Sequence, residues 1–149
     1  MSNLSRIGLA IRTADCLPIL IADPRNRAVA AVHAGWRGVV CEIASKTVEV
    51  MTHQFRSKPE DLVVAIGPGI GPCCFEVGPE VAVQFQLTGR TKVDLVETMC
   101  RQLGRNGVGA RQISACGLCT HCDPELFESY RRDREPAGRM VSLIGVDGI

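Results

Sequence analysis

The segment 17–33 constrains the fold of this 149-residue chain most strongly, because it holds two apolar runs joined by a polar stretch. Both runs are rich in residues that favour β-strands, and the stretch 23–27 (Asp-Pro-Arg-Asn-Arg) is rich in turn formers. We therefore expect a β-hairpin with strands over 17–22 and 27–33. In such a hairpin, the residue before the first strand lies beside the end of the second strand.

The rest of the chain alternates between short apolar runs and segments with helical periodicity. Further strands are expected at 7–12, 62–66, 112–115 and 140–144. Helices are expected at 39–55, at 79–85, from Asp94 to about 104, and at 124–130. The alternation predicts an α/β or α+β class with a mixed sheet. With no repeat or linker visible, we expect a single domain over 1–149.

Composition excludes several classes of protein. A net charge of +1 and an aromatic content of 4% argue against nucleic-acid and membrane-surface partners. The apolar runs are too short to span a bilayer. Eight cysteines would suit a disulfide framework in a small secreted protein. No secretory signal pattern is visible and 46% of the residues are hydrophobic, so we expect reduced thiols and a cytoplasmic location.

Cys16 and His33 form the first candidate site. Cys16 precedes the first hairpin strand and His33 ends the second, so the hairpin would bring both to one end of a sheet. A thiolate beside an imidazole suits zinc or copper, or a Cys-His nucleophile pair. A catalytic zinc site normally has three protein ligands plus water, so two residues do not complete one. A buried structural cysteine and a hydrogen-bonded histidine remain the alternative.

The segment 116–122 forms the second candidate site, because its three cysteines follow the spacing C-x₂-C-x₂-C. The spacing resembles the start of an iron–sulfur run, but Leu126 stands where that run needs its fourth cysteine. Cys73 or Cys74 could instead complete a structural zinc site in space. Packed thiols in a loop are the alternative.

Positive charge concentrates near the end of the chain, at Arg131, Arg132, Arg134 and Arg139. Guanidinium groups bind phosphate through paired hydrogen bonds. A solvated charged face is the alternative.

Six blocks of sequence together resemble one known family. They cover residues 13–20, 33–38, 66–77, 119–120, 129–133 and 138–140. In this order they look like the laccase-domain family, also called the YfiH-type multicopper polyphenol oxidoreductases. The resemblance runs over nearly the whole chain and implies the fold of that family, a mixed β-sheet sandwich flanked by helices.

The resemblance also implies a function. Members of the family are cytosolic zinc-dependent enzymes that phosphorolyse adenosine, inosine, guanosine and methylthioadenosine and that deaminate adenosine. Copper-dependent oxidation of polyphenols is also attributed to the family. Two histidines and one cysteine hold the metal, and Cys16 and His33 correspond to the cysteine and the second histidine. Arg37, Arg131 and Arg132 correspond to basic positions for phosphate, so the resemblance makes Cys16, His33 and Arg37 the catalytic candidates, with purine nucleosides and phosphate as partners.

The sequence departs from the family at one metal ligand. The first histidine of the family lies upstream of the cysteine block, and no histidine precedes Cys16. We therefore expect an N-terminally truncated form of the fold with an incomplete metal site and impaired activity. A homodimer or a complementing chain would then supply the third ligand and cover an open sheet edge. A Cys-His hydrolase and a non-catalytic metal-binding module at 116–122 are the other expectations.

Overall fold

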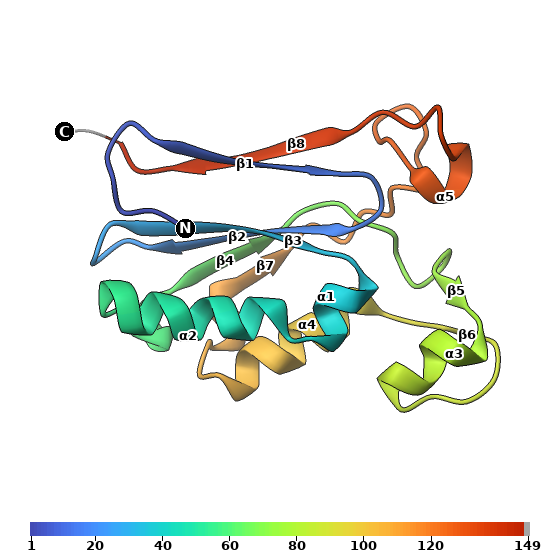
Figure 1. Cartoon of the computed structure of the whole chain (residues 1–149), viewed down its shortest axis with the longest axis horizontal. Helices are drawn as coiled ribbons and strands as arrows, with labels where there is room; N and C mark the ends of the chain where they lie inside the picture. Colours follow the sequence, from blue (N-terminus) through green and yellow to red (C-terminus); the bar gives the residue numbers. More distant parts are fainter. Residues whose placement is uncertain (148–149) are drawn as a thin grey trace.

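The computed structural model describes residues 1–147 and arranges them in three layers (Figure 1). The first layer is a two-stranded antiparallel sheet of β1 (Gly8–Thr13) and β8 (Met140–Gly145). The second is a four-stranded mixed sheet with the order β3-β2-β4-β7. Helices cover the other face of this second sheet. The expected mixed sandwich flanked by helices is confirmed.

The predicted hairpin forms one half of the four-stranded sheet, with β3 at the edge and β2 inside. β2 (Leu17–Asp23) pairs antiparallel with both β3 (Ala28–Ala34) and β4 (Val63–Ile66), and β4 pairs parallel with β7 (Ile113–Ala115). The Asp23 carboxylate accepts hydrogen bonds from the backbone N–H groups of Arg25 at 2.9 Å and Asn26 at 3.0 Å. These bonds fix the turn between the two hairpin strands.

The core lies between this sheet and three helices. They are α1 (Trp36–Val40), α2 (Ile43–Phe55) and α4 (Leu95–Arg105). The Asp94 carboxylate caps α4 by accepting a hydrogen bond from the Glu97 N–H at 2.8 Å, as the sequence predicted. The largest fully buried side chains of the sheet and helices are Leu17, Ile19, Ile21, Val39, Val48, Met51, Val64, Ile66, Leu95, Met99 and Leu103.

The remaining elements are short. They are α3 (Pro79–Ala82), α5 (Tyr130–Asp133), the two-residue strands β5 (Glu76–Val77) and β6 (Thr91–Lys92), and 3₁₀ turns at 59–61, 83–85 and 110–112. None of the helices within residues 1–147 is long and apolar enough to cross a membrane.

Two helix predictions were wrong. The helix expected over 39–55 is two helices, because Glu42 takes a left-handed conformation with φ of 54° that an α-helix cannot continue. The helix expected over 124–130 is a turn, in which the Asp123 side chain accepts a hydrogen bond from the Leu126 N–H at 3.3 Å. The helix begins only after Ser129, whose hydroxyl accepts from the Arg132 N–H at 3.2 Å.

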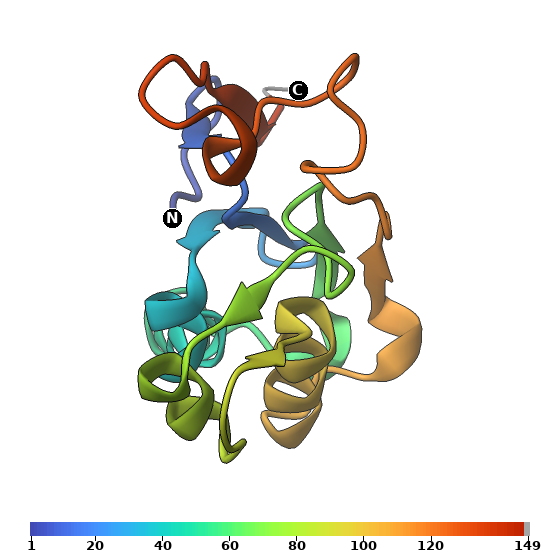
Figure 2. The ribbon, with the colours of Figure 1, turned by 90° about the vertical axis from the view of Figure 1, so that its right-hand side faces the viewer.

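Most of the loops of interest lie at one edge of the four-stranded sheet, where "edge" means the side formed by strand ends and not an outermost strand. β2 begins at this edge, whereas β3, β4 and β7 end there, because β2 runs antiparallel to β3 and β4 and β7 runs parallel to β4. β1 ends and β8 begins at neighbouring positions, since Thr13 pairs with Met140. Figure 2 looks onto this edge. The candidate residues from all these segments therefore meet at one end of the molecule.

Candidate functional site

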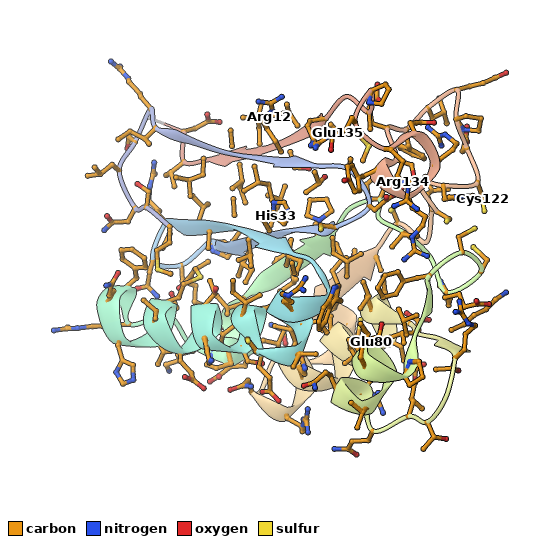
Figure 3. The ribbon with its side chains drawn as sticks, turned by 45° about the vertical axis from the view of Figure 1, so that its right-hand side comes forward. Arg12, His33, Glu80, Cys122, Arg134 and Glu135 are labelled. Atoms are coloured by element: carbon orange, nitrogen blue, oxygen red, sulfur yellow. The ribbon has the colours of Figure 1, made fainter. Side chains whose placement is uncertain are left out.

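Cys16 and His33 lie at this edge on the same face of the sheet. In the register of the hairpin, Leu17 pairs with Ala34 and Pro18 with His33. Side chains alternate along a strand, so His33 points away from the helices that bury Ala34. Figure 3 shows His33 on the side of the sheet that faces β1 and β8. The His33 side chain is exposed and Cys16 is half-buried.

Immediately after β3, the backbone at Gly35 passes beside the Cys16 side chain. A Cβ atom added to Gly35 would lie 2.8 Å from the Cys16 Sγ, closer than real Cβ contacts allow. Gly35 therefore lets the backbone pass beside the thiol. Two residues later, the exposed guanidinium of Arg37 stacks on the Trp36 ring at 4.1 Å from its centroid.

The surroundings of Cys16 disfavour a free thiolate. Burial raises the pKa of the Cys16 thiol above its usual value, the Asp15 carboxylate raises it further, and Arg139 opposes both. A cysteine nucleophile typically has a lowered pKa. This environment therefore argues against the Cys-His hydrolase.

Cys16 and His33 are suitable types of metal ligand, but two protein ligands are too few to complete a zinc site. Thiolate and imidazole are soft and intermediate donors that suit zinc and copper. Among residues 1–147, however, neither belongs to a group of three or more ligand side chains close enough to share an ion. A metal at this pair would need a further ligand from outside the described residues, as the sequence led us to expect.

Asp15 ties the hairpin to two distant loops. It takes a left-handed conformation with φ of 80°, which aspartate tolerates better than most residues. Its Oδ1 accepts a hydrogen bond from the Thr120 hydroxyl at 2.7 Å, and its Oδ2 accepts from the Arg131 N–H at 2.6 Å. Its carbonyl oxygen accepts from the Ile70 N–H at 2.8 Å. The position of Cys16 therefore depends on the loops that carry these donors.

The two neighbouring arginines of α5 have different surroundings. The Arg132 guanidinium pairs with both carboxylate oxygens of Asp133, at 2.8 and 2.9 Å, and donates to the carbonyl oxygens of Thr120 and Phe127, both at 2.9 Å. The Arg131 guanidinium donates through Nη1 to the Glu76 carbonyl oxygen at 3.0 Å. Phosphate binding by Arg132 stays a prediction, and it would require Arg132 to release bonds that hold the loop.

Arg139 lies close enough to Cys16 to lower the pKa of its thiol, a proximity that the sequence did not indicate. With Arg12 it lines a hollow of about 380 Å³ beside the start of β8. A cavity of about 690 Å³ lies between α1, α4 and 83–86, and none of the candidate residues lines it. The hollow at Arg139 is therefore the better candidate for an anion.

Four cysteines from two turns come together at the same edge. The side-chain sulfurs of Cys73, Cys74, Cys119 and Cys122 all lie within 4.8 Å of one another and could hold a metal ion. Cys119 and Cys122 were expected in such a site, with Cys73 or Cys74 as a further ligand. Both of the latter join it, whereas Cys116 does not. All eight cysteines are free thiols in the structure.

Comparison with known proteins decides the family. Residues 1–147 match the family described as multi-copper polyphenol oxidoreductase laccase. The chain belongs to this family. The expected resemblance is thereby confirmed.

Relatives of the laccase family carry the name purine nucleoside phosphorylase. The protein of that name from Deinococcus radiodurans is 42% identical over 93% of this chain and 56% of its own length. Purine nucleoside phosphorylase YlmD from Bacillus subtilis is 35% identical over 97% of the chain and 57% of its own length. The chain therefore spans little more than half the length of these relatives.

Solved structures agree on the fold. The crystal structure of YlmD from Geobacillus stearothermophilus superposes with a TM-score of 0.93 at 36% identity, covering 98% of this chain and 59% of that one. A hypothetical protein YfiH from Bacillus licheniformis gives a TM-score of 0.93 at 34% identity, with 97% and 60% covered. The three-layer arrangement is thus that of the YfiH and YlmD proteins over part of their length.

Proposed function

We propose that this chain carries the larger part of a zinc-dependent purine nucleoside phosphorylase site. Its substrates would be adenosine, inosine, guanosine or methylthioadenosine, together with phosphate. The same site would deaminate adenosine. One observation carries the proposal: in a chain whose relatives are named purine nucleoside phosphorylases, Cys16, His33 and several arginines meet at one edge of the sheet.

Cys16 and His33 would be two of the metal ligands, with the third from outside the described residues. A bound zinc ion supplies Lewis acidity and an acidified water, which suits hydrolytic loss of the purine amino group. The Asp15 hydrogen bonds to Thr120 and Arg131 hold the Cys16 backbone and thereby keep the two ligands in register.

Phosphate would bind through guanidinium groups near this pair. Arg37 is exposed and its guanidinium is oriented by the Trp36 ring. Arg139 lines the adjacent hollow with Arg12, and Arg131 lies close by. In phosphorolysis these charges would hold the phosphate in line with the anomeric carbon as the purine leaves.

Hypoxanthine release from inosine tests the proposal. The zinc-loaded 149-residue chain is incubated with inosine and phosphate, and the free base is quantified by chromatography. With adenosine as the substrate, the same assay measures both reactions: adenine is the product of phosphorolysis and inosine is the product of deamination. We expect Cys16→Ser and His33→Ala to reduce both reactions by at least about 100-fold, as for lost catalytic groups. Arg37→Ala should raise the phosphate KM and spare deamination.

Matched controls keep the assay specific. His53 is an exposed histidine on α2, so His53→Ala should leave the rates unchanged. Activity that is phosphate-independent, or that survives His33→Ala, would overturn the proposal.

A third ligand from a second chain is part of the proposal. Val141 and Leu143 on β8 are 56% and 65% exposed and offer an apolar face for a homodimer or a complementing chain. Activity that rises with the square of protein concentration in dilute solution would support a shared site. A cytoplasmic location, with reduced thiols, also belongs to the proposal.

A copper-dependent polyphenol oxidase is the second candidate, because the family description contains that activity. Copper loading followed by a phenol oxidation assay distinguishes the two. Oxidase activity that needs Cys16 and His33 without any phosphorolysis would favour this candidate. Activity that survives chelators and is lost on thiol alkylation would instead point to the Cys-His hydrolase.

A further inference from the structure

We propose that Cys73, Cys74, Cys119 and Cys122 bind one zinc ion as four thiolate ligands, in a structural site distinct from the Cys16–His33 pair. None of the four belongs to the proposed phosphorylase site, so this inference stands whether or not the chain has that activity. The occupant is a single divalent ion that prefers sulfur in tetrahedral geometry. Each coordinating thiol would lose its proton to solvent on binding.

The distances between the sulfurs fit one ion. With Zn–S bonds of about 2.3 Å, a tetrahedral site separates its sulfurs by about 3.8 Å. The Cys122 Sγ lies 3.4 Å from the Cys74 Sγ and 3.6 Å from the Cys73 Sγ, and all four sulfurs lie within 4.8 Å of one another. A polynuclear iron–sulfur cluster places iron and sulfide between the thiolates and would spread them further.

Two tight turns deliver the ligands in pairs. The first turn is closed by hydrogen bonds from the N–H groups of Cys74 and Phe75 to the Gly71 carbonyl oxygen, at 3.0 and 2.9 Å. The second is closed by the Cys122 N–H, which donates to the Cys119 carbonyl oxygen at 3.2 Å. Its C-x₂-C spacing is typical of zinc sites.

The backbone around the cluster is arranged for thiolate ligands. The Gly71 N–H donates to the Cys119 Sγ at 3.2 Å, a bond that stabilises negative charge on sulfur. A Cβ atom added to Gly71 would lie 3.2 Å from the Cys119 Cβ and 3.3 Å from the Cys73 Sγ. The absence of a side chain at Gly71 thus lets the two turns approach.

Charge around the cluster is complementary. Four thiolates around Zn²⁺ carry a net charge of −2. Arg132 donates through Nη1 to the carbonyl oxygens of Thr120 and His121, at 2.9 and 3.3 Å, within the second turn. Arg131 donates to the Glu76 carbonyl oxygen at 3.0 Å, just beyond the first turn. Since Arg132 is itself paired with the Asp133 carboxylate, Arg131 is the guanidinium that offsets the charge of the occupied site.

The cluster also lies beside Asp15. Thr120, between Cys119 and Cys122, donates its hydroxyl to Asp15 and its N–H to the Gly69 carbonyl oxygen at 3.0 Å. An ion at the four sulfurs would cross-link the loop that follows β4 with the loop that follows β7. It would thereby fix the donors that hold the residue next to Cys16.

Cobalt titration of the metal-free, reduced chain tests the proposal. Tetrahedral thiolate coordination of cobalt gives intense visible bands and a thiolate-to-cobalt charge-transfer band. Zinc displaces the cobalt, so both absorptions disappear when zinc is added. We expect one equivalent of cobalt with this spectrum in the unaltered chain and in Cys16→Ser. Cys122→Ser should weaken cobalt affinity by at least about 100-fold, and Cys41→Ser, an exposed cysteine outside the cluster, should not.

A second measurement guards against misfolding of the Cys122→Ser variant. In the unaltered chain, zinc should slow alkylation of the four cluster cysteines at least 10-fold and leave Cys41 and Cys116 unprotected, as read by peptide mass spectrometry. A tetrahedral spectrum lost in Cys16→Ser and kept in Cys122→Ser would overturn the proposal. Equal alkylation of all eight cysteines with zinc present would do so too, as would a Cys74–Cys122 disulfide in freshly purified protein.

Discussion

Two groups of candidate metal ligands lie at the same edge of the four-stranded sheet, and they differ in how many donors the fold brings together. The hairpin delivers two donors, Cys16 and His33, from neighbouring strands. The two turns after β4 and β7 deliver four cysteine sulfurs within 4.8 Å of one another. This hairpin contributes one donor from each strand, whereas each of the two turns contributes two. The first group therefore depends on a further ligand, and the second does not.

Metal removal should separate the two groups most strongly. If the free zinc concentration is 100 times the dissociation constant of the four-thiolate site, removing zinc should lower the free energy of unfolding by about 2.7 kcal/mol. That corresponds to a fall in Tm of roughly 10 °C for a domain of this size. Calorimetry with and without a strong chelator measures it. Unaltered chain and Cys16→Ser should lose the same amount, and Cys122→Ser should lose almost nothing on chelation.

The link between the two groups is the next largest effect. Asp15→Ala removes the acceptor for the Thr120 hydroxyl, which is fully buried, and for the Arg131 N–H. Two hydrogen bonds to a charged, partly exposed acceptor make the expected loss about 2–4 kcal/mol in urea unfolding. Asp15→Asn, which keeps one acceptor oxygen, should lose less. An Asp15→Ala variant as stable as the unaltered chain would contradict this role.

Thr120→Val tests one of the two hydrogen bonds to the Asp15 carboxylate, the one donated by the Thr120 hydroxyl. The isosteric change deletes the 2.7 Å hydrogen bond to Asp15 and keeps the buried methyl group. We expect a loss of about 1 kcal/mol in unfolding free energy. Combined with Asp15→Ala, its effect should be less than additive, since both delete the same bond. Full additivity of the two losses would show that the bond contributes nothing.

His33→Ala should have the smallest effect on stability. The side chain is exposed, so we expect a change within about 0.5 kcal/mol, equal to that of His53→Ala on α2. Chemical denaturation of the two variants side by side gives the comparison. A large loss for His33→Ala alone would mean that the Cys16–His33 pair is itself a structural site.

Much of the fold could be predicted from the sequence, because the β2–β3 hairpin and the capped α4 rest on local patterns. The break at Glu42 and the late start of α5 could not, since apolar periodicity continues across Glu42 and Pro124 is compatible with a helix start. In both places a local backbone conformation overrode the periodic pattern.

The part of the candidate site that could be predicted is the part indicated by the spacing of cysteines along the sequence. C-x₂-C spacing and a vicinal pair indicated the four-cysteine cluster, although not that both Cys73 and Cys74 join it. The role of Asp15 was not predictable, because its partners Thr120 and Arg131 are 105 and 116 positions away in sequence. The internal hydrogen bonds of Arg132 were equally hidden, since a run of arginines looks the same whether it binds phosphate or a protein loop.

Zinc X-ray absorption spectroscopy of the 149-residue chain, loaded with one equivalent of zinc, identifies which of the two groups binds the ion. We expect a first shell of four sulfurs at about 2.3 Å and no nitrogen, because the fold brings four cysteine sulfurs together and only two donors at Cys16 and His33. The same shell should appear in Cys16→Ser. A mixed shell of imidazole nitrogen and one sulfur, lost in Cys16→Ser, would contradict a four-thiolate site at the two turns.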